Sequence, residues 1–231
     1  RMSLAWPRLL PAGGGAALNP AGVAFYVAVF EELRKYDIEP LVTLYHWDLP
    51  QALDDAYGGW LDREIVADFA NYADLCFAAF GDYATSWTTF NEALTFIGEG
   101  YGDGVHAPGR CSDRDRCAAG DSTREPLVAG HHVLLAHAAA VAKFRARFDS
   151  TYEIGMVNCG CTNTSRPPGA PMLRYKTSPS AFCVMVSLVD VAGIRRCGCR
   201  TARSYNRDLF PACAMAMATV FGAGYSTHQI P

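Results

Sequence analysis

Apolar residues in the first two thirds of the chain follow two periodicities. Nearly continuous apolar runs, typical of strands covered on both faces, alternate with segments whose apolar residues recur every three or four positions, as in amphipathic helices. We expect strands at residues 2–6, 40–45, 86–90 and 152–158, and helices at residues 21–36, 62–80 and 125–148. A long loop should join the third strand to the last helix. Repeated strand–helix alternation favours parallel strands with helices packed outside them.

Four strand–helix units are too few to close an eight-stranded barrel, which typically takes about 250 residues. The order of the elements suits an open, doubly wound sheet equally well. The hydrophobic pattern therefore predicts an α/β protein and leaves two architectures open, between which only residues with chemical roles can decide.

The character of the chain changes near residue 158. Residues 1–153 carry 21 acidic and 12 basic residues, a net charge of −9, whereas residues 154–231 carry 2 acidic and 8 basic residues, a net charge of +6. The second part contains no glutamate and six of the nine cysteines, and all four tryptophans lie in the first part. We expect a division into residues 1–158 and 159–231. A frameshifted or mis-spliced reading frame is one explanation of the second part, and an authentic divergent segment is the other.

Composition limits the classes of function. Half of the residues are hydrophobic and 12% are aromatic, which is sufficient for a substantial core. The net charge of −3 gives no overall reason to expect a nucleic acid or an anionic membrane surface as a partner. No run of 18 strongly apolar residues predicts a membrane span. We therefore expect a soluble protein that acts on a neutral small molecule.

Polar residues end two of the expected strands. His46 and Trp47 follow the second strand, and Asn91 and Glu92 follow the third. The ends of the strands form the catalytic mouth of a parallel barrel. There Glu92, with its pKa raised by apolar or like-charged neighbours, can protonate a leaving oxygen, while amide, imidazole and indole groups suit a sugar. The alternatives are a helix cap or loop hydrogen bond at Asn91 and Glu92, and a core tryptophan beside a hydrogen-bonded histidine.

Taken together, several stretches resemble a known family. In order and spacing, residues 4–11 (LAWPRLLP), 44–50 (LYHWDLP), 58–61 (GGWL) and 89–92 (TFNE) resemble the motifs of family 1 glycoside hydrolases, and residues 107–112 (APGRCS) and 130–138 (GHHVLLAHA) are similar to plant-type β-glucosidases of that family. The resemblance covers residues 1 to about 158. It implies an incomplete (β/α)8 TIM barrel that holds the second to fifth strands of the family barrel, followed by an irregular C-terminal tail.

The resemblance implies hydrolysis of the O-glycosyl bond of a small-molecule β-glycoside by two glutamates, with retention of configuration. Glu92 would be the acid/base, Asn91 would bind the 2-hydroxyl of the sugar, His46 would bind a neighbouring hydroxyl, and Trp47 would shape the same subsite. Ala93 stands where the family usually has proline, which should alter the loop and leave the chemistry intact. No cofactor is expected. Relatives are secreted, vacuolar or plastidial, which leaves the compartment open.

The second glutamate of such a mechanism has no recognisable counterpart in this sequence. In the family it lies in an Ile/Val-Thr-Glu-Asn-Gly-like motif on the seventh strand, and the 231 residues contain no such motif. The family's first strand and its late Glu-Trp sugar contact have no counterpart either. We therefore expect impaired hydrolysis, and the alternative is a non-catalytic sugar-binding or structural remnant. Exposed edges of a partial barrel should favour self-association.

Cys111 and Cys117 resemble a loop disulfide of the plant-type relatives. Five residues separate them, so closure is sterically reasonable, and two unpaired thiols are the alternative. We expect no metal site. The spacing of His131, His132 and His137 does not present a shared ligand face on a helix, and the Cys-Gly-Cys pairs at residues 159–161 and 197–199 are weak evidence for zinc.

Overall fold

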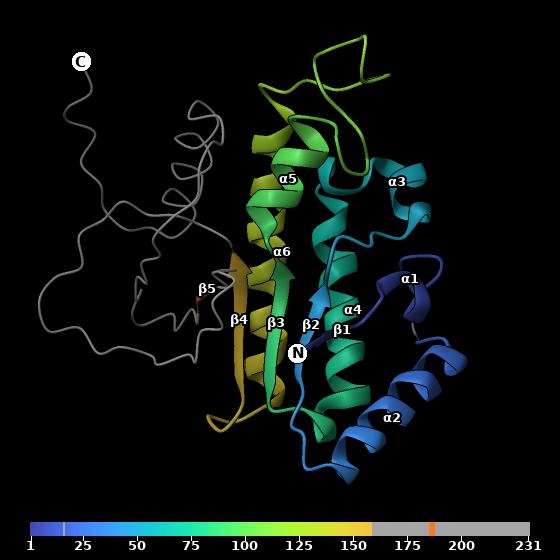
Figure 1. Cartoon of the computed structure of the whole chain (residues 1–231), viewed down its shortest axis with the longest axis vertical. Coiled ribbons are helices and arrows are strands. Elements are labelled where there is room, and N and C mark those ends of the chain that lie inside the picture. Colours follow the sequence, from blue (N-terminus) through green and yellow to red (C-terminus); the bar gives the residue numbers. More distant parts are fainter. Residues whose placement is uncertain (16, 159–184, 188–231) are drawn as a thin grey trace, which may run out of the picture.

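The structure, a computed structural model, describes residues 1–15, 17–158 and 185–187. Four of its strands run parallel in sequence order: β1 (Met2–Ser3), β2 (Leu41–Tyr45), β3 (Ser86–Asn91) and β4 (Glu153–Asn158). A short fifth strand, β5 (Met185–Ser187), pairs antiparallel with β4 (Figure 1). The expected irregular tail otherwise lies outside the described residues, as do both Cys-Gly-Cys pairs. The prediction of an α/β fold with parallel strands is confirmed.

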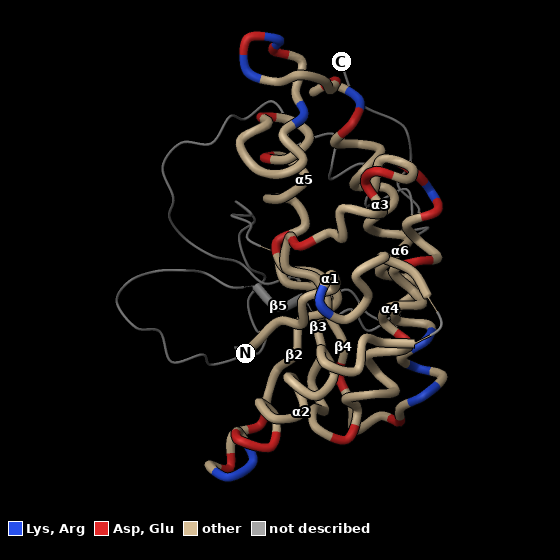
Figure 2. Tube along the Cα trace, turned by 90° about the vertical axis from the view of Figure 1, so that its right-hand side faces the viewer, with Lys and Arg blue, Asp and Glu red and all other residues tan. Residues whose placement is uncertain are grey.

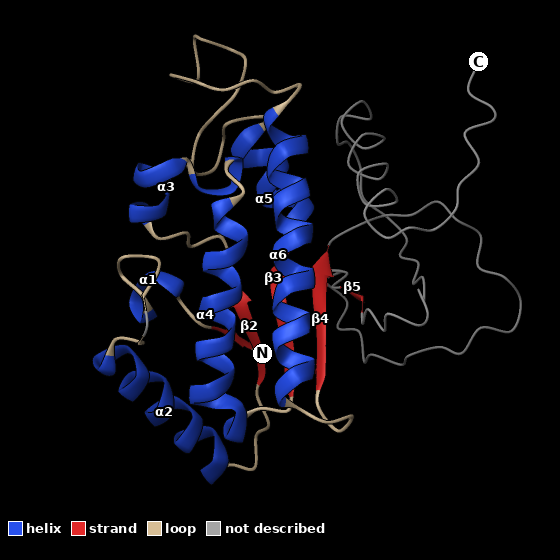
Figure 3. Ribbon diagram, turned by 180° about the vertical axis from the view of Figure 1, so that it is seen from behind, coloured by secondary structure: helices blue, strands red, loops and turns tan. Residues whose placement is uncertain are grey.

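Helices cover the sheet and fill the connections between its strands. They are α1 (Trp6–Leu9), α2 (Pro20–Lys35), α3 (Gln51–Tyr57), α4 (Glu64–Phe80), α5 (Ala93–Tyr101) and α6 (Glu125–Arg147), with 3-10 turns η1 (Gly59–Leu61) and η2 (Gly81–Tyr83). The two longest helices, α4 and α6, lie side by side over one face of the sheet (Figure 3). Charged residues gather in helices and loops, and β1, β2 and β3 carry none (Figure 2). The sheet therefore forms the apolar centre of the fold.

Aromatic side chains bind the helices to the sheet. The ring of Trp6 stacks on that of Tyr72 with centroids 4.8 Å apart, and Phe69 of α4 stacks on Phe90 of β3 at 4.5 Å. All four side chains are fully buried. Burial of a large apolar side chain contributes on the order of 2 kcal/mol, so these contacts fix α4 against the strands that carry the site.

Helix α6 is long and apolar enough to cross a membrane by length and composition alone. Half of its most apolar stretch is buried inside the protein, where Phe144 meets Phe77 of α4 with ring centroids 5.3 Å apart. A core helix packed on a sheet has the same apolar character, so packing accounts for this composition.

Two expectations about local structure were wrong. The first strand ends at Ser3 instead of Trp6, because Pro7 lies in the first turn of α1 and favours helix initiation there. Helix α5 occupies part of the expected long loop. Gly98 and Gly100 weaken its helical signal, and burial of its apolar residues, which include Phe96 and Tyr101, against its neighbours compensates for that low propensity.

Candidate active site

The site is built where β2 and β3 end. Tyr45 of β2 pairs with Phe90 of β3, so the residues that follow these strands leave the sheet at the same edge. His46 and Trp47 follow β2, Asn91 is the last residue of β3, and Glu92 follows it. The carboxyl ends of parallel strands are where α/β folds place ligands, and the sequence-predicted residues meet at such an end.

Glu92 stands between a strand and a helix. Its amide N–H donates to the carbonyl of Val157 at 2.6 Å, and its own carbonyl accepts from the N–H of Phe96 at 3.1 Å. Its backbone is left-handed, with φ 49° and ψ 57°, a conformation that is strained for a residue with a side chain. Contacts on both sides hold this turn at the N-terminus of α5, and Glu92 is partly exposed.

Asn91 is almost fully buried, with 3% of its surface exposed. Its side-chain Oδ1 accepts a hydrogen bond from the guanidinium of Arg1, and its backbone carbonyl accepts from Nε1 of Trp47 at 2.8 Å. The indole N–H of Trp47 is thus used in positioning Asn91, while its ring packs against His106 with centroids 5.4 Å apart. Trp47 thus connects the loop after β2 to the end of β3.

His46 is exposed beside these residues. Desolvation lowers the pKa of its imidazole, the positive charge of Arg1 lowers it further, and the negative charge of Glu92 opposes the shift. The imidazole is therefore neutral at pH 7, and it can both donate and accept hydrogen bonds. Its electrostatic coupling to Glu92 and Arg1 indicates that the three groups share one environment.

Sequence reasoning missed Arg1. Besides Asn91, its guanidinium reaches Thr43, whose hydroxyl accepts from Nε of Arg1 at 3.3 Å and from the hydroxyl of Thr88 at 2.7 Å. These contacts place a positive charge beside the buried hydroxyls of Thr43 and Thr88, on β2 and β3. Periodicity gives no signal for such a residue, because Arg1 precedes the first expected strand instead of following one.

Asn158 was missed as well, although the strand-end rule points to it. It ends β4, the neighbour of β3, after which Glu92 follows directly; Val157 of β4 pairs with Asn91 of β3. Its side-chain Oδ1 is buried without a hydrogen-bond partner within the part of the chain that the structure describes. A buried polar atom of this kind calls for a partner, so Asn158 is a further candidate residue of the site.

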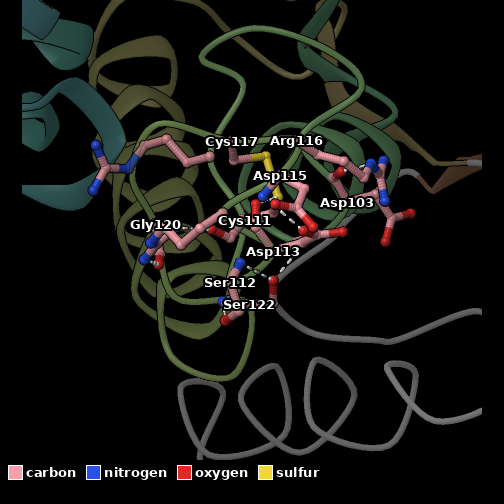
Figure 4. The surroundings of a disulfide bond; sticks show 12 residues. Asp103, Cys111, Ser112, Asp113, Asp115, Arg116, Cys117, Gly120 and Ser122 are labelled. Atoms are coloured by element: carbon pink, nitrogen blue, oxygen red, sulfur yellow. Dashed lines mark hydrogen bonds between the residues drawn. A yellow bond between two sulfur atoms is a disulfide. The ribbon is translucent and has the colours of Figure 1, made fainter.

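The loop between α5 and α6 contains a disulfide, Cys111–Cys117, with Cα atoms 5.5 Å apart (Figure 4). The alternative of two unpaired thiols does not hold in this structure. Two hydrogen bonds also connect Ser112 and Ser122. The amide N–H of Ser112 donates to the hydroxyl of Ser122 at 2.8 Å, and the amide N–H of Ser122 donates to the hydroxyl of Ser112 at 2.9 Å. The guanidinium of Arg116 donates to the carbonyl of Asp103 at 2.8 Å. The loop is therefore closed by several independent contacts.

Two of the three histidines on α6 make internal hydrogen bonds. Nδ1 of His132 lies 2.8 Å from the carbonyl oxygen of Trp60, so this nitrogen carries the proton and donates. Nδ1 of His137 lies 2.8 Å from the hydroxyl of Thr89, which is within 3.2 Å of the carbonyl of Gly155. These histidines join α6 to η1 and to the sheet beneath the site.

Comparisons with known proteins show which family the chain resembles. The profile of "Glycosyl hydrolase family 1" matches residues 1–171, which extends past residue 158. A chloroplastic β-D-glucosidase of Triticum aestivum, named for 4-hydroxy-7-methoxy-3-oxo-3,4-dihydro-2H-1,4-benzoxazin-2-yl glucoside, is 52% identical over 160 residues, which are 68% of this chain and 28% of that enzyme. The chain thus spans less than a third of this relative's length.

Solved structures give the same result. The rice Os3BGlu6 β-glucosidase matches with a TM-score of 0.64 and 48% identity over 67% of this chain and 33% of its own. A β-glucosidase of the fungus Humicola insolens, solved in complex with glucose, matches with a TM-score of 0.64 and 44% identity over 67% of this chain and 33% of its own. By sequence and by fold, the chain belongs to glycosyl hydrolase family 1.

Proposed function

We propose that this chain carries the acid/base half of a retaining β-glucosidase site, with Glu92 as the proton donor. The position of Glu92 carries this proposal: it lies between β3 and α5, follows Asn91 directly, and interacts electrostatically with His46. A carboxyl group held there can protonate the glycosidic oxygen as the bond breaks and later deprotonate the attacking water.

Asn91 and His46 are proposed to bind the sugar. Because Oδ1 of Asn91 accepts from Arg1, the amide nitrogen is the group that can donate to a sugar oxygen. A neutral His46 can bind a second hydroxyl, and Trp47 shapes the subsite by holding Asn91 in place. The name of the wheat relative and the glucose in the fungal structure support a β-D-glucoside as the substrate class.

Turnover by the 231-residue chain on its own is proposed to be slow or absent. Retention requires a second carboxylate about 5–5.5 Å from the first, which attacks the anomeric carbon and forms a glycosyl-enzyme. The chain contains no motif of the kind that carries this residue in the family, and no glutamate after Glu153. In this view, residues 1–158 are the partial barrel and residues 159–231 a divergent segment. Among the described residues β1 is an edge strand, which would favour self-association.

A non-catalytic sugar-binding protein is the second candidate, and the same missing motif favours it. The two candidates differ in whether Glu92 affects chemistry or only binding. Calorimetric titration with glucose or cellobiose measures binding, and release of 4-nitrophenol from 4-nitrophenyl β-D-glucoside measures turnover.

The test compares the unaltered chain with Glu92→Gln, Asn91→Ala and Glu31→Gln, the last as a control that removes a distant exposed charge. We expect glucose binding that Asn91→Ala weakens, and 4-nitrophenol release close to the buffer rate. Robust turnover that disappears in Glu92→Gln would overturn the proposed impairment and retain the acid/base role. Absence of both binding and turnover would overturn the proposed site itself.

A further inference from the structure

A cavity of about 510 Å³ lies between the loop after β2, helix α3 and the segment 104–109 that follows α5. These elements lie at the upper end of the molecule in Figure 1. Glu92, Asn91 and His46 are not among the residues that line it, and Trp47 is shared with the candidate active site. Its volume is in the range of small-molecule sites.

Aromatic rings form much of the cavity wall. They belong to Tyr45, Trp47, Trp60, Phe96 and Tyr101. The rings of Tyr45, Trp60 and Phe96 also contact one another edge-on or tilted, with centroids 5.2–6.2 Å apart. The faces of aromatic rings carry negative electrostatic potential, which attracts cations.

Two carboxyl groups line the cavity, those of Asp48 and Asp54. Among the described lining residues there is no lysine or arginine, and the imidazole of His106 is paired with Glu99 at 2.8 Å. Neither aspartate takes part in an ion pair among the described residues. Burial raises the pKa of Asp48 to about 6, which reflects a carboxylate with too little compensation. Arg110 does not line the cavity and compensates only in part, because its guanidinium, which interacts electrostatically with Asp54, donates to both carboxylate oxygens of Glu125, at 2.9 and 2.6 Å.

Tyr101 provides an independent indication of a ligand. It lines the cavity, only 1% of its surface is exposed, and its hydroxyl has no hydrogen-bond partner among the described residues. Burial raises the pKa of this phenol and the negative charge of Asp54 adds to the shift, while the backbone of Trp60 and the charge of Arg110 oppose it, so Tyr101 and Asp54 are near each other. Burying a hydroxyl without a hydrogen-bond partner costs free energy, unless a ligand supplies that partner.

We propose that this cavity binds a small organic ammonium ion, which Asp48 and Asp54 neutralise and whose carbon atoms pack on the aromatic wall. The ammonium group donates hydrogen bonds that both carboxylates and the oxygen of Tyr101 can accept. A metal ion fits less well, because no group of three histidine, cysteine or acidic side chains in the described ranges is arranged to hold one.

The outer wall of the cavity is anchored by the disulfide. Gly104 lines the cavity with φ +68°, and a Cβ atom at this position would lie 2.2 Å from Sγ of Cys117. The segment 104–109 therefore rests directly on the closed loop of Figure 4. A fixed wall means that the cavity exists before the ligand arrives, which reduces the ordering cost of binding.

Isothermal titration of the 231-residue chain with benzylammonium chloride tests the proposal, with benzyl alcohol as a neutral ligand of similar shape. We expect saturable binding of the ammonium ion and about tenfold weaker binding of the alcohol. Asp54→Asn and Asp48→Asn should each weaken ammonium binding several-fold, and Glu31→Gln, which removes a distant exposed charge, should not. Circular dichroism spectra verify that each variant is folded.

Three results would overturn the proposal: no binding of the ammonium ion, equal binding of the alcohol, or unchanged affinity in both aspartate variants. Glu92→Gln and competition with glucose separate this cavity from the candidate active site. Benzylammonium that glucose displaces, or that Glu92→Gln weakens as much as Asp54→Asn does, would be bound at the active site, and the proposal would fail. Its success or failure leaves the proposed role of Glu92 unaffected.

Discussion

Trp47 donates a hydrogen bond of 2.8 Å from its indole Nε1 to the backbone carbonyl of Asn91. The bond joins the loop after β2 to the last residue of β3. Trp47 has φ 75°, and Glu92, directly after Asn91, has φ 49°, so left-handed residues lie on both sides of the connection. Such conformations persist only where the surroundings hold them, and this hydrogen bond is one of the contacts that do so.

Trp47→Phe should lower the free energy of unfolding by about 1–3 kcal/mol, because the carbonyl of Asn91 loses its donor while an aromatic ring remains in place. It should also weaken glucose binding, since Asn91 would be less firmly held. Urea denaturation followed by circular dichroism measures the first effect, and calorimetry the second.

Tyr36→Phe is the control for that substitution, because Tyr36 is 69% exposed and the loss of its hydroxyl should change stability by less than about 0.5 kcal/mol. If Trp47→Phe were as harmless as Tyr36→Phe, the indole N–H would not be holding the site together.

Strong periodicity made most of the fold predictable. The strands β2, β3 and β4 and the helices α2, α4 and α6 lie within two residues of their expected bounds, because each combines a clear hydrophobic pattern with burial on the matching face. Helix α5 lacked that clarity, since two glycines in nine residues reduce its propensity. Whether such a segment forms a helix depends on its tertiary packing, which cannot be read from the local sequence pattern.

The candidate site could be located from the sequence where it follows the strand ends. That rule points to His46, Trp47, Asn91 and Glu92, whose proposed roles come from the family resemblance, and Asn158 obeys the rule too. Arg1 does not: its guanidinium reaches Asn91, 90 residues away in the chain, through a long side chain. The sequence also cannot show that the hydroxyl of Tyr101 has no hydrogen-bond partner within the described part of the chain, because only the folded chain shows which buried groups lack partners.

His137 should make the protein sensitive to acid. Burial, aided by the charge of Arg145, lowers the pKa of His137 to about 4, below the ordinary value of 6.5 that applies to the unfolded chain. Between pH 4 and pH 6.5 the unfolded chain binds more protons than the folded chain. The contribution of His137 to the free energy of unfolding is therefore fully present above pH 6.5 and is lost as the pH decreases toward 4. The loss should reach about 3 kcal/mol.

His137→Gln tests this, because glutamine can still bond to Thr89 and does not titrate. Urea denaturation at several pH values between 7 and 4 should show a shallower loss of stability in this variant than in the unaltered chain. His131→Gln, at an exposed position of the same helix, should keep the original slope. Equal slopes in all three proteins would mean that His137 is not the responsible group.

Gly104→Ala and Gly98→Ala should have opposite effects on stability. At Gly104 the new Cβ would meet Sγ of Cys117 at 2.2 Å, and φ +68° is strained for alanine, so we expect a loss of more than about 1 kcal/mol. At Gly98, inside α5, nothing lies within 4 Å of the new Cβ, and alanine should stabilise by about 0.5–1 kcal/mol. Urea denaturation compares both. A stabilising Gly104→Ala would show that segment 104–109 does not rest on the disulfide.

An external anion should replace the second carboxylate if Glu92 is the acid/base and the nucleophile is missing. Azide can attack the anomeric carbon of 4-nitrophenyl β-D-glucoside from the face opposite the leaving group, while Glu92 protonates the departing oxygen. The guanidinium of Arg1, which contacts Asn91, favours an anion near the sugar. We expect azide to accelerate 4-nitrophenol release and to yield α-glucosyl azide, because a single displacement inverts the configuration.

The stereochemistry of the product separates this explanation from its rivals. Azide rescue that gives the α-azide, and that falls roughly 10²-fold in Glu92→Gln, requires both a working proton donor and an unfilled nucleophile position. A β-azide would instead reveal two displacements, and hence a carboxylate of this chain already acting as the nucleophile. No acceleration at all, from a chain that calorimetry shows to bind glucose, would leave Glu92 as a sugar-binding residue and favour the non-catalytic protein.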